Sequence, residues 1–245
     1  MNWKTIIIKQ LQDPLKTLNI VLNAHQEEQI CKYYEKLKEW NSVMNLTAIV
    51  DEVEFATKHI IDSIALVKYI DIFQINTIID IGTGAGLPGI PLKIFFPHIE
   101  ITLVDSLNKR INFLNEVIRD LELKDTVAIH GRAEELGRDL DYREYYDCCV
   151  SRAVSQLPVL SEYCIPFVKV GGSFIAYKSV NSDEEIEASE YAIEVLGGKI
   201  LKIEDIDLLD GDMPRRFVMI DKIVETPERY PRRAGVPQKK PLMKS

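Results

Sequence analysis

Ile78-Ile79-Asp80-Ile81-Gly82-Thr83-Gly84-Ala85-Gly86-Leu87-Pro88-Gly89 is the most informative stretch of this 245-residue chain and sets its fold class. It begins as an apolar strand and continues into a glycine-rich turn, with Pro88 placed for the first turn of a helix. Glycine permits positive φ angles and leaves no side chain in the way of a ligand. Ligands of open α/β sheets bind at the carboxyl ends of the strands, so the turn predicts a ligand site.

An acidic residue follows at the distance that such a site needs. The next apolar run, Ile101–Val104, ends in Asp105, which lies 23 residues beyond Gly82. A carboxylate at the tip of the second strand can accept both hydroxyl groups of a ribose. The turn and the acid together predict a cofactor that contains a nucleoside.

Two classes of cofactor compete for this pattern. The string Gly84–Gly89 formally fits G-x-G-x-x-G, but a dinucleotide site requires its first glycine directly after the strand. Here that first glycine is Gly82, and Leu87 takes the place of the third. The form acid-x-Gly-x-Gly-x-Gly favours S-adenosylmethionine, and hence a methyltransferase over a nicotinamide dehydrogenase. A purely structural glycine turn is the remaining alternative.

The rest of the chain alternates between strand-like and helix-like segments. Helical spacing of Ile30, Tyr33, Leu37 and Trp40 predicts a small N-terminal helical cap over residues 1–70. Residues 71–245 are predicted to form an α/β, Rossmann-like methyltransferase domain with a mostly parallel, doubly wound sheet. The predicted strands are Thr77–Ile81, Glu100–Val104, Thr126–His130, Tyr146–Ser151, Gly172–Tyr177 and Phe217–Ile223, and the predicted helices are Gly89–Phe95, Arg110–Leu121, Ala133–Leu140, Leu157–Val168 and Glu184–Leu196.

Composition and charge narrow the classes of protein. No apolar run approaches the roughly 20 residues of a membrane span, and the N-terminus lacks a signal-peptide pattern, so we expect a cytoplasmic protein. The four cysteines show no zinc-like spacing, so no metal is expected. The net charge is −8, yet residues 213–245 contain nine basic and three acidic residues. This basic C-terminal tail is compatible with phosphate contact or with an ordinary solvated surface.

The ordered set of motifs resembles the bacterial 16S ribosomal RNA guanine-N7 methyltransferases, first known as glucose-inhibited division protein B. The resemblance covers nearly the whole chain, and each motif alone is weak. Besides the glycine turn, the motifs are Trp40-Asn41, Asn45-Leu46-Thr47, His59-x-x-Asp62-Ser63, Leu103-Val104-Asp105-Ser106, Gly131-Arg132-Ala133-Glu134, Ser151-Arg152-Ala153 and Arg232-Arg233-x-Gly235-x-Pro237-x-Lys239-x-Pro241-Leu242.

The resemblance implies a binding site for S-adenosyl-L-methionine. Gly82, Gly84 and Leu87 would line its methionine and ribose end, and Asp105 would hold the ribose. Ala133 and Glu134 would flank the adenine, and Arg152 would lie beside the cofactor and the target base. The implied partner is 16S rRNA or the small ribosomal subunit, and we expect a monomer.

Guanine N7 already carries an unprotonated lone pair, so in-line methyl transfer needs orientation rather than a general base. We therefore hypothesise that Arg152 orients the cofactor carboxylate or guanine O6. Lys178, Arg232, Arg233 and Lys239 are candidate phosphate contacts, together with the 45–62 region of the cap.

Several residues keep a structural interpretation beside the functional one. His59 is expected to be a satisfied core histidine, and Asp80 to order the glycine turn. Asp62 and Ser63 are as consistent with a helix-stabilising pair as with a functional one. Tyr230 either stacks on a base or packs in the tail. Two functions compete with RNA methylation. One is methylation of a small molecule, and the other is a non-catalytic RNA-binding module with a retained cofactor pocket.

Overall fold

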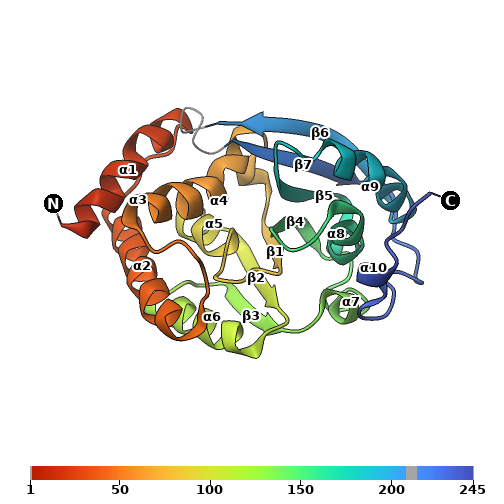
Figure 1. Ribbon diagram of the computed structural model, residues 1–245, viewed down its shortest axis with the longest axis horizontal. Helices are drawn as coiled ribbons and strands as arrows, with labels where there is room; N and C mark the ends of the chain where they lie inside the picture. Colours follow the sequence, from red (N-terminus) through yellow and green to blue (C-terminus); the bar gives the residue numbers. More distant parts are fainter. Residues whose placement is uncertain (1, 208–213, 245) are drawn as a thin grey trace.

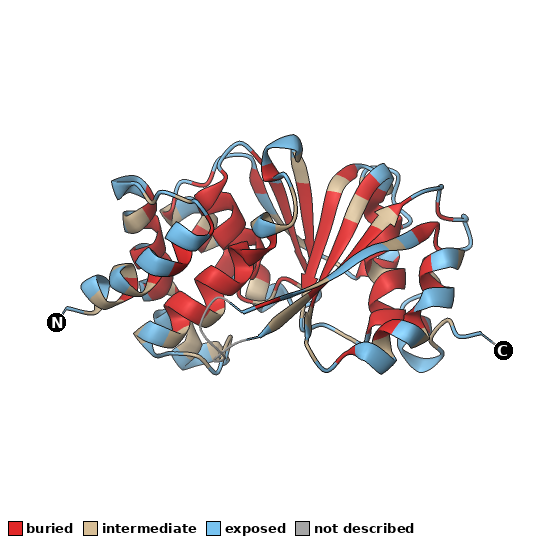
Figure 2. Ribbon diagram, turned by 90° about the horizontal axis from the view of Figure 1, so that it is seen from above, coloured by how far each residue is buried: buried red, intermediate tan, exposed pale blue. Residues whose placement is uncertain are grey.

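The computed structural model describes residues 2–207 and 214–244. Met1, at the start of the predicted cap, and Met213 and Ser245, at the ends of the predicted basic tail, lie outside the described residues. Within the described part, seven strands form one sheet in the order β3-β2-β1-β4-β5-β7-β6. Helices cover both faces of this sheet (Figures 1 and 2).

The strands are β1 (Thr77–Ile81), β2 (Glu100–Asp105), β3 (Thr126–His130), β4 (Tyr146–Arg152), β5 (Val168–Ser179), β6 (Gly198–Ile206) and β7 (Arg215–Lys222). The first five run parallel, and β7 runs antiparallel to β5 and β6. Parallel strands covered on both faces are apolar along their whole length, and four of the five residues of β1 are buried. The predicted mostly parallel, doubly wound sheet is confirmed.

The helices that connect the strands are α5 (Gly89–Phe95), α6 (Asn108–Asp120), α7 (Ala133–Leu136), α8 (Leu157–Cys164) and α9 (Asp183–Val195), with α10 (Val236–Lys239) in the tail. The helix predicted over 133–140 is therefore only one turn long, and the one predicted over 157–168 ends at Cys164. The structure also contains β6, which the sequence pattern did not predict. Most of its residues are exposed at the edge of the sheet, so it has no apolar run to reveal it.

The N-terminal segment is helical, as predicted. It contains α1 (Trp3–Thr17), α2 (Ala24–Met44), α3 (Glu52–Glu54), a π-helical turn η1 (Phe55–Ile61), α4 (Asp62–Ile64) and a 3-10 turn η2 (Ala65–Lys68). A capping box starts α2, because Asn23 and Gln26 each accept a backbone N–H of the other.

The cap shares its hydrophobic core with one face of the sheet. Tyr33 and Phe55 of the cap pack in one cluster with Ile78 and Leu103 of the strands. A second cluster joins the opposite face of the sheet to α8 and α9. In Figure 2 the sheet lies between these two buried layers. The cap is therefore fixed relative to the carboxyl ends of the strands, where the candidate site lies.

Candidate active site

The glycine turn after β1 is held by the strand beside it. The N–H groups of Gly82 and Thr83 both donate to the carbonyl of Val104, at 2.9 and 3.0 Å. Gly82, Gly84 and Gly86 have φ angles of 71°, 61° and 90°, which L side chains rarely adopt. The glycines are therefore required by the path of the backbone.

Asp80 orders this turn from below. Its Oδ2 accepts the Thr83 hydroxyl at 2.7 Å and the Gly89 N–H at 2.9 Å. The side chain is fully buried, and burial raises the pKa of Asp80 to about 6. The expected role of Asp80 in shaping the turn agrees with these contacts.

Asp105 lies beside the turn because β1 and β2 are parallel and pair Ile81 with Val104. Its Oδ2 accepts the Gly84 N–H at 3.0 Å, and its Oδ1 accepts the Leu107 N–H at 2.9 Å. Arg110 of α6 also donates to Oδ2, at 3.0 Å. The carboxylate is 3% exposed. The acid and the glycine turn, predicted together from sequence, are thus in direct contact.

The residues around this contact fit a nucleoside cofactor. A methyl group added at Gly84 would meet only the Gly82 carbonyl, at 3.9 Å, so the backbone borders open space there. A carboxylate has about four acceptor positions. In Asp105 two of them accept the Gly84 and Leu107 N–H groups, and one accepts Arg110. If Arg110 moves away, two positions are available for two ribose hydroxyl groups. The Arg110 side chain is 35% exposed and can turn toward solvent.

Leu87, at the end of the turn, is 6% exposed and packs into the core cluster on the cap side of the sheet. Ala133 and Glu134 begin α7 directly after β3, at the same edge as Asp105. Both are largely buried. The Glu134 carboxylate accepts the Gly235 N–H at 2.9 Å, so its side chain points to the tail.

Arg152 ends β4 and reaches back to the cap. Its Nη1 donates to Asp62 Oδ2 at 2.6 Å and to the Lys58 carbonyl at 3.0 Å. Arg215 of β7 donates to the same carboxylate through Nε, at 2.6 Å, and Nη2, at 3.1 Å. The Asp62 side chain is 1% exposed. Among the described residues, one buried carboxylate thus faces two guanidinium groups, so this three-residue cluster carries more positive than negative charge.

This arrangement corrects the helix-stabilising interpretation of Asp62. The Asp62 carboxylate accepts from Arg152 and Arg215, whereas the Ser63 hydroxyl donates within the helix, to the His59 carbonyl at 2.5 Å. The two arginines come from strands far away in the chain, so local spacing could not reveal them.

His59 is buried, as expected, but only one of its ring nitrogens is satisfied. Nε2 lies 2.9 Å from Thr47 Oγ1, and Nδ1 has no hydrogen-bond partner among the described residues. Burial first, and then the nearby Arg152, lower the pKa of His59 to about 4. The imidazole is neutral at physiological pH and 4% exposed.

Of the four residues predicted to contact RNA, two form ion pairs with carboxylates and two are exposed. Lys178 donates to the Ser155 carbonyl at 2.7 Å and pairs with Glu185. Arg232 pairs with Glu162, which is fully buried. Arg233 and Lys239 are exposed, and no ion pair of theirs occurs within the described parts of the chain. Tyr230 is 8% exposed and packs in the second core cluster, which favours its structural interpretation.

Residues that the sequence patterns did not single out hold the site together. Arg110 donates to Asp105, and Arg215 donates to the Asp62 carboxylate that also binds Arg152. The Tyr33 hydroxyl donates to the Ala85 carbonyl of the glycine turn at 2.6 Å. Tyr33 belongs to the helical periodicity of the cap, which marked it only as a core residue. Of these residues, only Arg110 could have been predicted from local sequence, because it lies five residues after Asp105, in the first turn of the following helix.

Comparison with known proteins fits this geometry. Residues 26–209 match the family model GidB, described as rRNA small subunit methyltransferase G. The chain belongs to this family. It is accordingly a methyltransferase that uses S-adenosylmethionine.

Curated relatives match over nearly their whole length. A Ribosomal RNA small subunit methyltransferase G of Lachnoclostridium phytofermentans is 54% identical over 94% of this chain and 95% of its own. The protein of the same name from Acetivibrio thermocellus is 51% identical over 96% of both chains. Among solved structures, a mutant of MtNAS in complex with S-adenosylmethionine has a TM-score of 0.53 at 14% identity, covering 82% of this chain and 72% of that one. That likeness supports the fold alone.

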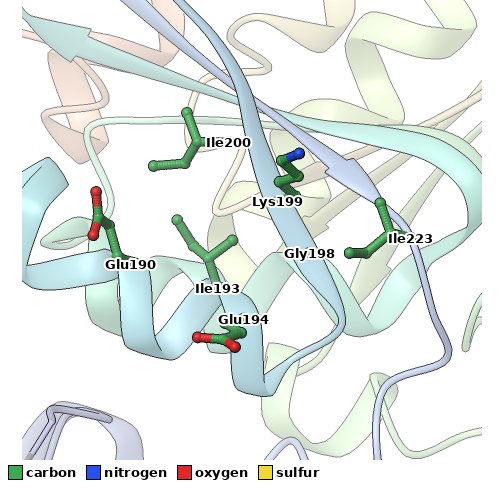
Figure 3. Close-up of a pocket in the computed structure, with 7 residues that line it drawn as sticks. All are labelled: Glu190, Ile193, Glu194, Gly198, Lys199, Ile200 and Ile223. Carbon is green, nitrogen blue, oxygen red and sulfur yellow. The ribbon is translucent and has the colours of Figure 1, made fainter.

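Other features lie outside the site. In the described residues, no helix is long and apolar enough to cross a membrane, and no group of three or more potential ligands could hold a metal ion. A hollow of about 400 Å³ lies between α9 and β6 (Figure 3). It is lined by Glu190, Ile193, Glu194, Gly198, Lys199, Ile200 and Ile223. β6 is the edge of the sheet opposite β3, β2 and β1, whose carboxyl ends form the candidate site, so this hollow lies away from that site.

Proposed function

We propose that the enzyme transfers a methyl group from S-adenosylmethionine to N7 of a guanine in 16S rRNA. The match to the family over residues 26–209 carries this proposal. We also propose a cytoplasmic location, because small ribosomal subunits are made there.

The proposed cofactor site uses Gly82, Gly84 and Leu87 of the turn, Asp105 at the tip of β2, and the backbone of Ala133 and Glu134. When bound, S-adenosylmethionine supplies an electrophilic methyl group on a sulfonium. Asp105 would accept the ribose hydroxyl groups after Arg110 has moved aside. The hydrogen bond between Asp105 and the Gly84 N–H keeps the turn and the acid at a fixed separation.

The chain needs no base for this reaction, because guanine N7 has no proton to lose. His59 is consistent with this, since it is neutral but 4% exposed and so has little access to a substrate. Arg152 would orient the cofactor carboxylate or guanine O6, using the positive charge left over at Asp62. Alignment of reacting groups of this kind can supply up to ~7–11 kcal/mol of the barrier.

For RNA contact, the exposed Arg233 and Lys239 of the tail are the favoured residues. Lys178 and Arg232 are engaged by Glu185 and Glu162 and would position other groups instead. The 45–62 region of the cap is a weaker candidate, because its Lys58 pairs with Glu54 and it carries further acidic residues.

Transfer of labelled methyl to ribosomal RNA from a strain lacking this protein tests the proposal. We expect label in 7-methylguanosine of 16S rRNA, with the naked RNA and the assembled subunit compared as substrates. Phosphate contacts predict that the activity falls steeply as salt rises. Label on another atom, or none in RNA, would overturn the assignment, and methylation of a small molecule that is insensitive to salt would favour the competing function.

A further inference from the structure

The C-terminal segment 223–244 is held by arginine side chains from the segment between α7 and β4. Arg143 donates to the carbonyls of Thr226 and Tyr230, at 2.5 and 2.8 Å, and Arg138 donates to that of Pro231, at 2.7 Å. In Figure 1 this dark blue segment lies beside α7 and α8. It is a docked part of the molecule.

The strongest anchor is the pair of Arg232 and Glu162. The Glu162 carboxylate is completely buried and accepts the Arg232 backbone N–H at 2.7 Å, Nε at 2.9 Å and Nη2 at 2.6 Å. Charge-assisted bonds of this kind have strict geometry. They therefore fix the position of the residues that follow Arg232.

Those following residues contact two loops at the carboxyl ends of the strands. Gly235 donates its N–H to Glu134 Oε1 at 2.9 Å, and the Ser155 hydroxyl donates to Gln238 Oε1 at 3.1 Å. Glu134 follows β3, and Ser155 follows β4. The tail thus bridges α7, whose Ala133 and Glu134 are proposed to flank the adenine, and the loop that follows Arg152, which is proposed to orient the cofactor carboxylate or guanine O6.

The loop after β4 is in turn packed on the glycine turn. A methyl group added at Gly82 would lie 2.4 Å from a Val154 side-chain carbon, so Val154 rests against the Gly82 backbone. Displacing Ser155 would move its neighbour Val154 and hence this contact. Displacing Gly235 would leave the buried Glu134 carboxylate without that hydrogen bond.

We propose that Gly235 and Gln238 are positioning residues for the methyl donor, and that the tail forms a wall of the cofactor site through Glu134 and Ser155. The inference rests on the proposed cofactor site. It does not depend on the identity of the RNA substrate.

The test is calorimetric titration of the full chain with S-adenosylmethionine. The double variant Gly235→Ala, Gln238→Ala strains one contact and deletes the other, because Gly235 has a φ of 80°. A Cβ at Gly235 has nothing within 4 Å, so no clash is added. We expect binding about five- to tenfold weaker, and a matching rise in the KM for the cofactor at nearly unchanged kcat.

Gly171→Ala is the matched control. Gly171 has a φ of 85°, and a Cβ there also meets nothing within 4 Å, so the backbone penalty is equal but lies in β5, away from these loops. Cofactor affinity equal to that of Gly171→Ala would overturn the inference. Asp105→Ala tests the site itself. If it binds normally, the proposed site fails; if it alone loses binding, the site stands and the role of the tail is refuted.

Discussion

Asp62 and Glu162 are two buried carboxylates that both bind arginine, yet they have different roles. Glu162 accepts one guanidinium and one backbone N–H, so its charge is balanced by Arg232 alone. Asp62 accepts two guanidinium groups, those of Arg152 and Arg215, so among the described residues this cluster has one positive charge in excess. A balanced pair anchors a segment, whereas an excess charge at the strand tips is available to an anionic or polar ligand.

The greatest change is expected at the balanced pair. Glu162→Ala leaves the Arg232 guanidinium without its partner, and breaking a buried pair in this way costs about 3–5 kcal/mol of the free energy of unfolding. Glu162→Gln keeps an oxygen that can accept the backbone N–H and should lose less. Urea denaturation measures both variants. If Glu162→Ala is as stable as the parent, the pair is no anchor and the distinction between the two carboxylates fails.

The second prediction concerns two buried titratable groups near Arg152, His59 and Asp80. The pKa of His59 is lowered from 6.5 to about 4, so its contribution to stability is lost as pH falls from 6.5 toward 4. The pKa of Asp80 is raised from 3.8 to about 6, so its contribution is lost as pH rises from 3.8 toward 6. Arg152 faces both groups, Asp62 and Glu54 also face His59, and Asp105 also faces Asp80.

The two contributions, each about 3 kcal/mol at ~1.4 kcal/mol per pKa unit, oppose one another between pH 4 and 6. Relative to Asp80→Asn, the parent protein should therefore lose stability as pH rises through this window. Relative to His59→Gln, it should gain stability. Chemical denaturation of the three proteins at several pH values measures these differences, and a difference that stays constant with pH contradicts the cause given for that group.

The third prediction concerns the excess charge. Arg152→Ala should lower kcat about 100-fold, as removal of one aligned donor commonly does. Cofactor binding is retained if Arg152 orients guanine O6, and it weakens as well if Arg152 orients the cofactor carboxylate. Arg152→Lys keeps the charge but not the planar geometry and should recover only part of the rate. Methyl-transfer kinetics together with cofactor titration measure this. Unchanged turnover in Arg152→Ala would remove its role in catalysis and leave Asp62 as a second structural anchor.

The weakest effect is expected at the exposed cations. Arg233→Ala with Lys239→Ala should weaken RNA binding several-fold and reduce the salt dependence of binding by about one unit of slope for each phosphate that the tail no longer binds. The affinity for S-adenosylmethionine should not change, because both side chains are exposed and, within the described residues, form no hydrogen bond or ion pair with the proposed cofactor site. RNA titrations at several salt concentrations measure the slope, and a slope equal to that of the parent would place RNA contact elsewhere.

Much of the site was predictable because its signals are local. The glycine turn is recognisable in the sequence because its backbone φ angles require glycine, and Asp105 lies at the end of the next strand. The parallel register of β1 and β2 then makes their contact unavoidable. The edge strand β6 was missed because its mostly exposed residues lack the apolar run that marks the inner strands.

The roles of the charged residues could not be predicted in this way. Arg232 and Lys178 are residue types that commonly bind phosphate, but in the folded chain they form ion pairs with Glu162 and Glu185. Asp62 looked like a local helix residue until Arg215, 153 positions away, proved to share its carboxylate.

The order of residues was enough to predict the parallel strands of the sheet, the glycine turn and the acid beside it, because each depends on periodicity or on spacing along one short stretch. The family was recognisable from an ordered set of such short motifs. Which arginines are anchors and which keep free charge was settled by folding in three dimensions. The reason is that a salt bridge depends on the distance between two side chains in space, and chain separation carries no information about that distance.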